Sequence, residues 1–100
     1  MRDRRWRRAR LRDAYLYLCT DRRAASADLE VFLDAVLGAG VDVVQLRDKD
    51  ATAEELRAAA AVMRACAHRH GALFVINDDA LLARDCGADG VHVGQDDLHP

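Results

Sequence analysis

The chain has 100 residues, a net charge of −2 and a composition that is 51% hydrophobic but only 5% aromatic. These values fit one small globular domain. No apolar stretch approaches the roughly 20 residues that cross a bilayer, so no membrane span is expected. The three cysteines are widely spaced and include no C-x-x-C pair, which argues against a zinc site and favours a reducing, cytoplasmic setting.

The first 13 residues differ from the rest of the chain. They carry seven arginines and two aspartates, a local charge of +5, which leaves −7 for the other 87 residues. Apart from Trp6, no aromatic series or basic helix face accompanies these arginines, so binding to nucleic acid or to a membrane is not expected. We therefore expect residues 1–13 to be a disordered, solvated arm and residues 14–100 to form the folded domain.

Short apolar runs alternate with helical patterns from residue 14 onward. A first strand is expected over 14–19, and Ser26 is a candidate N-cap for the helix that follows. The apolar stripe of that helix has i, i+3, i+4 spacing and comprises Leu29, Phe32, Leu33, Val36 and Leu37. A second strand is expected over 41–46, directly after two glycines.

The second half of the chain repeats this alternation. Thr52 and Glu55 have the spacing of a capping box and predict the start of a second helix, with Gly71 as its C-terminal stop. Its core stripe is predicted to be Leu56, Ala60, Met63 and Ala67. A third strand is expected over 73–76, a short helix over 80–85 and a fourth strand over 90–93.

The predicted order is β-α-β-α-β-α-β, which implies an α/β fold with a parallel sheet. Each unit takes about 25 residues, so eight units would need about 200, the lower end for a (β/α)₈ barrel. A parallel half of a TIM-type barrel and an open four-stranded α/β sandwich fit this length equally well. A half-barrel would leave its first and last strands unpaired, and such edges favour self-association.

Polar clusters follow three of the expected strands: Gln45-Leu46-Arg47-Asp48-Lys49, Asn77-Asp78-Asp79 and Gln95-Asp96-Asp97. Ligands of parallel α/β folds collect at the carboxyl ends of the strands. Arg47 and Lys49 suit phosphate groups, and Asp78 and Asp97 offer the hard oxygen atoms that Mg²⁺ prefers. The pattern predicts one site for a magnesium-bound diphosphate, although Asp78 or Asp79 could instead cap the helix that follows.

Four segments resemble thiamine phosphate synthase in order and approximate spacing: residues 16–21, 40–49, 76–78 and 87–98. The resemblance implies a (β/α)₈ barrel and a transferase that couples hydroxymethylpyrimidine diphosphate with thiazole phosphate, giving thiamine phosphate and pyrophosphate. The residues that it implies for the pyrimidine substrate are Gln45, Leu46, Arg47, Asp48, Lys49 and Asn77. It further implies that Asp78 and Asp97 hold Mg²⁺.

The resemblance covers only the N-terminal half of the proteins of that family. The later strands of the family carry a further substrate-binding serine and lysine and the loops for the thiazole phosphate, so the 100-residue chain is expected to be inactive alone. A related thiazole tautomerase is an alternative, but the Gln45 to Lys49 run and the two aspartates favour the synthase. A non-catalytic, self-associating half-barrel is a third possibility.

Overall fold

The structure is a computed structural model that describes residues 2–14, 16–77 and 79–92. Its four parallel strands form one sheet in chain order: β1 (Tyr17–Thr20), β2 (Val43–Leu46), β3 (Leu73–Asn77) and β4 (Gly90–His92). In register, Cys19 lies beside Gln45, which lies beside Val75. The predicted order of strands and helices is confirmed, and the strand ends differ from the predicted ones by at most three residues.

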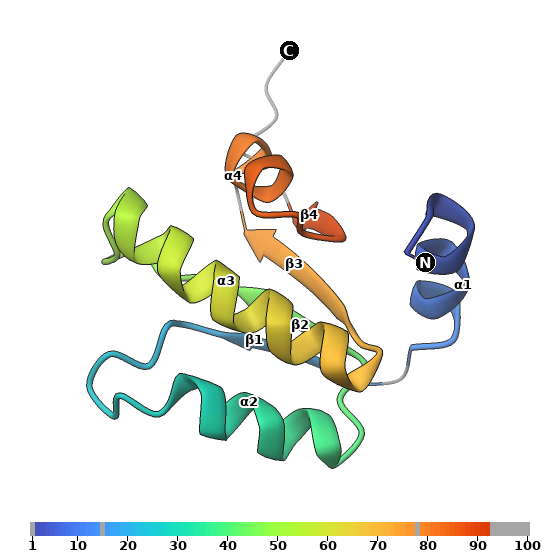
Figure 1. The fold of residues 1–100 in the computed structure, drawn as a ribbon, viewed down its shortest axis with the longest axis horizontal. Coiled ribbons are helices and arrows are strands. Elements are labelled where there is room, and N and C mark those ends of the chain that lie inside the picture. The colour runs from blue at the N-terminus through green and yellow to red at the C-terminus, as the bar shows by residue number, and fades with distance from the viewer. Residues whose placement is uncertain (1, 15, 78, 93–100) are drawn as a thin grey trace.

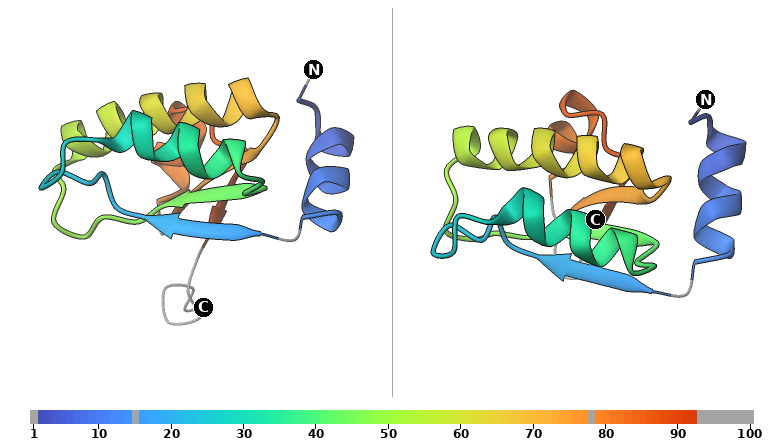
Figure 2. Two further views of the ribbon diagram at one scale, coloured as in Figure 1. Left: turned by 90° about the horizontal axis from the view of Figure 1, so that it is seen from below. Right: turned by 60° about the horizontal axis from the view of Figure 1, so that its bottom comes forward.

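The helices that connect the strands are α2 (Leu29–Gly38), α3 (Ala53–His70) and α4 (Ala80–Asp85). Helices α2 and α3 lie side by side on one face of the sheet (Figures 1 and 2), while α4 contacts β3 and β4. The opposite face lacks this cover, and Tyr17 of β1 is 53% exposed. A sheet in sequential order with helices on one face is half of a barrel. No helix in the described part of the chain is long and apolar enough to cross a membrane.

The hydrophobic core lies between the sheet and helices α2 and α3. Its largest fully buried side chains are Phe74, Leu33, Leu46, Met63, Ile76, Val44 and Cys66. Each large apolar side chain buried in this way contributes about 1.5–3 kcal/mol. The predicted apolar stripes face the core, because Leu33 and Leu37 of α2 and Met63 of α3 are buried.

Local sequence signals explain where the longest helix begins and ends. The Thr52 hydroxyl accepts the N–H of Glu55 at 3.1 Å, and the Glu55 carboxylate accepts the N–H of Thr52 at 2.9 Å, so the predicted capping box is present. Gly71 ends the helix with φ = 67°, a left-handed conformation that glycine adopts without strain. Helix α2 begins later than predicted: its N-cap is Asp28 and not Ser26.

The prediction of a disordered N-terminal arm was wrong, because Arg4–Arg12 form helix α1. Asp3 caps this helix by accepting the N–H of Trp6 at 2.8 Å. Arg2 and Arg7 pair with Asp89, whose side chain is only 2% exposed. These contacts span more than 80 residues of sequence, and they give the arm a partner that its local composition does not reveal.

Candidate functional site

A buried amide marks the centre of the bare face of the sheet. Gln45 in β2 is 4% exposed and is the only polar residue among those the structure describes that is buried as a whole. Its Nε2 donates to the Tyr17 hydroxyl, and its Oε1 accepts from Asn77 Nδ2 at 3.0 Å. The three side chains come from β1, β2 and β3 and form a hydrogen-bonded row, which orients both amides.

Two cations lie just beyond this row, at the carboxyl ends of β2 and β3. Arg47 and Lys49 border a hollow of about 220 Å³ together with Asn77. Both cations are exposed, and neither takes part in an ion pair within the described part of the chain. The structure therefore brings five of the six predicted substrate-binding residues, all except Gln45, to the border of one hollow, where the two cations lie among the carboxylates of Asp48 and Asp79.

Asp48 lies between the two cations but is already engaged. Its Oδ2 accepts the backbone N–H of Arg22 at 3.2 Å and lies 3.5 Å from the Arg22 guanidinium. Its Oδ1 accepts the N–H of Asp50 at 3.1 Å. With its side chain 10% exposed, Asp48 joins the loop after β1 to the loop after β2 and shapes the hollow.

Leu46 contributes to the site in a different way from its neighbours. It borders the hollow, but its side chain is 1% exposed and belongs to the hydrophobic core. Side chains of a strand alternate between faces, so Leu46 points away from the face of Gln45. A substrate could therefore contact only the backbone of Leu46, or the part of its side chain that forms the apolar floor of the hollow.

The predicted Mg²⁺ ligands, Asp78 and Asp97, lie outside the described residues. Asp79 caps α4 by accepting the N–H of Leu82 at 2.8 Å, so the capping role that the sequence left open belongs to Asp79. The charged side chains free to bind at the hollow are cationic, which fits a diphosphate. Metal binding by Asp78 and Asp97 remains a prediction.

Two residues of the site were not predicted from the sequence, Tyr17 and Arg22. Tyr17 has the same strand parity as Cys19, the register neighbour of Gln45, so strand alternation together with a parallel register could have identified it. Arg22 pairs with Asp48 at 3.5 Å and with Glu55 at 3.3 Å. It lies in a loop, where no periodic pattern indicates the direction of a side chain.

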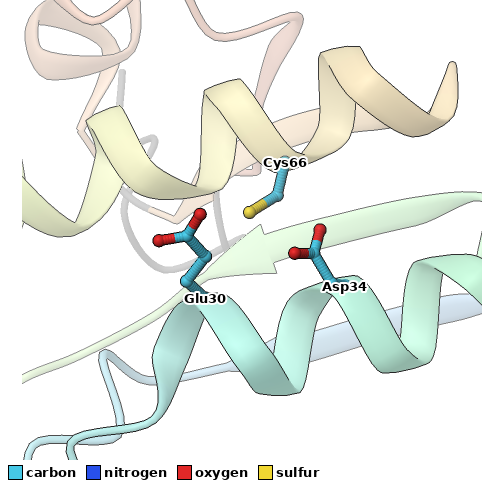
Figure 3. Close-up of side chains that lie close together, drawn as sticks. All are labelled: Glu30, Asp34 and Cys66. Carbon is cyan, nitrogen blue, oxygen red and sulfur yellow. The ribbon is translucent and has the colours of Figure 1, made fainter.

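A second group of potential metal ligands lies between α2 and α3 (Figure 3). The ligand atoms of Glu30, Asp34 and Cys66 are within 4.8 Å of one another. However, Arg69 Nη2 is 2.9 Å from Asp34, 3.1 Å from Cys66 Sγ and 3.5 Å from Glu30. Hydrogen bonds from Arg69 and then His70 lower the pKa of Asp34, and burial raises the pKa of the Cys66 thiol. The Arg69 guanidinium thus already occupies the centre of this group and offsets part of its negative charge, and its contacts link α2 to α3.

The fold and the site together define a class of protein. A parallel β/α sheet with helices on one face carries a buried amide, and two exposed cations that form no ion pair with a described residue follow the carboxyl end of β2. These features define a β/α-barrel type of protein, in which ligand sites lie at the carboxyl ends of the strands.

Comparison with known proteins assigns the chain to a family within this class. Residues 16–100 match the thiamine monophosphate synthase family. The thiamine-phosphate synthases of Acidothermus cellulolyticus and Thermobifida fusca are 56% and 54% identical to the chain, each over 91% of its length. The chain belongs to the thiamine monophosphate synthase family.

The similarity covers less than half of each relative. The chain spans 43% of the Acidothermus protein and 42% of the Thermobifida protein. In the thiamine phosphate pyrophosphorylase of Pyrococcus furiosus, the matching structure has a TM-score of 0.72 and 31% sequence identity, and covers 86% of this chain and 42% of that one. The half-barrel prediction is therefore confirmed.

Proposed function

We propose that this chain supplies the pyrimidine-diphosphate side of a thiamine phosphate synthase. The observation that carries the proposal is the joint position of Arg47, Lys49 and Asn77 around one hollow, beside the buried amide of Gln45. The cations would bind the diphosphate, and the two amides would orient the pyrimidine ring. Family membership supports this assignment of the substrate.

The chemistry requires negative charge to be stabilised on a departing group. In the proposed reaction, the bond between the pyrimidine methylene carbon and the diphosphate oxygen breaks, and the thiazole nitrogen forms a new bond to that carbon. The bonding electrons leave with the pyrophosphate. Arg47 and Lys49 would stabilise this charge without a protein base. Asp78 and Asp97 would hold Mg²⁺, which would supply further charge neutralisation for the leaving diphosphate.

Binding of the thiazole phosphate is proposed to need polypeptide beyond the part of the family that this chain matches. The relatives are more than twice as long as the matched region, so the chain accounts for one part of a complete barrel. We therefore propose that the 100-residue chain binds diphosphate but does not form thiamine phosphate alone. Self-association through the edges of β1 and β4 remains a prediction.

The direct test is a titration of the chain with inorganic pyrophosphate and Mg²⁺. Binding is monitored by the NMR chemical-shift changes of the backbone amides. The parent chain should show changes confined to residues 46–50 and 77. Lys49→Ala and Arg47→Ala should each weaken binding about tenfold, since a charge-assisted hydrogen bond is lost. Arg84→Ala is the matched control, because Arg84 is 78% exposed and does not border the hollow.

The control variant should bind within about twofold of the parent. Equal affinity of all four chains would remove Arg47 and Lys49 from the proposed role. Shift changes spread over α1 in place of the loop after β2 would place the anion at the opposite end of the sheet and would contradict the assignment.

A further inference from the structure

The hollow bordered by Arg47 and Lys49 also carries two carboxylates, those of Asp48 and Asp79. A carboxylate that was free to turn toward either cation would pair with it and would repel an incoming anion. Asp79 is held by the start of α4, where it accepts the N–H of Leu82 at 2.8 Å. The ability of the hollow to bind an anion therefore depends on what holds Asp48.

Asp48 is held by Arg22, which lies in the loop after β1. The Oδ2 of Asp48 accepts the backbone N–H of Arg22 at 3.2 Å and lies 3.5 Å from Nη1 of the same residue. The Nη2 of Arg22 lies 3.3 Å from Glu55 Oε2, so one guanidinium joins two carboxylates. Arg22 thereby links the loop after β1 to the loop after β2 and to the first turn of α3.

Burial makes this link a strong constraint on Asp48. The side chains of Arg22 and Asp48 are 21% and 10% exposed, and Nη1 of Arg22 is buried without a hydrogen-bond partner in the part of the chain that the structure describes. If Asp48 turned away, this buried nitrogen would lose its nearest negative charge, which carries a desolvation cost. Glu55 is fixed as well, because its other oxygen accepts the N–H of Thr52 at 2.9 Å.

Arg22 affects the hollow without bordering it. It is not among the described residues that line the hollow, and its guanidinium contacts Asp48 and Glu55. Among the described residues, Asp48 pairs with Arg22 and forms no ion pair with Arg47 or Lys49. The charge of Asp48 is thus offset from outside the hollow, by a side chain that a bound anion would not touch.

We propose that Arg22 is a positioning residue for the diphosphate site: by binding Asp48, it keeps that carboxylate from pairing with the two cations of the hollow. The proposal rests on the proposed diphosphate function and extends it to a residue outside the hollow. It also gives Asp48 a role other than contact with the substrate. Without the Arg22 side chain, Asp48 would keep only its hydrogen bonds from backbone N–H groups, and its charge would oppose a diphosphate.

The test is titration of the chain with inorganic pyrophosphate and Mg²⁺, applied to the parent, Arg22→Ala, Asp48→Asn and the double variant Arg22→Ala/Asp48→Asn. Arg23→Ala is the matched control, because it removes the same charge from the next residue of the same loop. Arg23 pairs with Asp28 at 2.6 Å and is not among the described residues that line the hollow. Urea unfolding of each variant confirms that binding is compared between folded chains.

Arg22→Ala should weaken pyrophosphate binding about tenfold, because an uncompensated carboxylate then faces the anion. The double variant should bind within about threefold of the parent, since the opposing charge has been removed with its partner. Asp48→Asn alone should bind at least as well as the parent. The Arg23→Ala control should bind within about twofold of the parent, because its charge lies away from the hollow.

Rescue by Asp48→Asn separates a positioning role from other roles of Arg22. A purely structural role, or direct contact of Arg22 with pyrophosphate, would leave the double variant as weak as Arg22→Ala and would overturn the proposal. Equal weakening by Arg23→Ala would also overturn it, by showing an effect of net charge. If Lys49→Ala weakened binding and Arg22→Ala did not, this inference alone would fail. Absence of binding by the parent would refute both this inference and the diphosphate assignment.

Discussion

Replacement of Asp89 by alanine should lower the free energy of unfolding by about 3 kcal/mol. The Asp89 side chain is 2% exposed and accepts hydrogen bonds from Phe74 N and Arg7 Nε, both at 2.8 Å, and from Arg2. Breaking a buried ion pair from one side costs about 3–5 kcal/mol. The Arg2 and Arg7 side chains are 13% and 38% exposed, so water partly rehydrates them and the lower end of that range applies.

Asp42→Ala is the matched comparison because Asp42 occupies the same position at the start of another strand. Its side chain is 25% exposed, and Arg10 lies 3.8 Å away. A partly exposed pair of this length contributes about 0–1 kcal/mol, and the hydrogen bond from Leu16 adds about 1 kcal/mol. Asp89→Asn should fall between the two alanine variants, since the amide oxygen can still accept the N–H of Phe74.

Urea unfolding followed by circular dichroism at 222 nm measures these differences, with the slope of the transition compared between variants. Release of α1 before the sheet would appear as a shallower first transition in Asp89→Ala. If Asp89→Ala and Asp42→Ala lost the same stability, burial would not control the strength of these pairs. The account given for the docking of α1 would then be wrong.

Two further predictions concern the helices. Thr52→Ala should cost about 1 kcal/mol in urea unfolding, since it removes one half of the capping box of α3; an unchanged midpoint would show that the cap is not needed for stability. Because Arg69 and then His70 hold the pKa of Asp34 below its ordinary value, the stability from this group is present above that ordinary pKa and is lost as the pH falls through the lower, folded-state value. Asp34→Asn should therefore flatten the acid limb of stability against pH, and a limb as steep as in the parent would contradict this assignment.

The elements that local patterns could predict are those whose stability comes from nearby residues. The stripes of α2 and α3 and the capping box at Thr52 depend on spacings of three or four residues. Helix α1 depends instead on Asp89, more than 80 residues away along the chain. Without that partner, its arginines have the composition of a solvated arm, so sequence alone gave the wrong prediction.

The site shows the same division between local and distant information. Gln45 interrupts an apolar run before the strand ends, and its burial follows from that pattern. Alternation along β2 could also have placed Leu46 in the core, although the resemblance assigned it to the substrate. The partner of Asp48 is Arg22, which lies in another loop. No spacing rule relates these two residues, so the structural role of Asp48 could not be predicted from the sequence.

The use of arginine and lysine in this chain follows the two ends of the sheet. Of its 15 basic residues, only Lys49 is a lysine, and it lies at the hollow opposite α1. The arginines at the strand starts make fixed, directional contacts with carboxylates, a geometry that the planar guanidinium favours. In the proposed reaction, a diphosphate would bind and then leave as pyrophosphate, and its charge and position would change. At this hollow the planar fork of Arg47 would fix the bound diphosphate, while the compact ammonium of Lys49 on its flexible stem would follow that change.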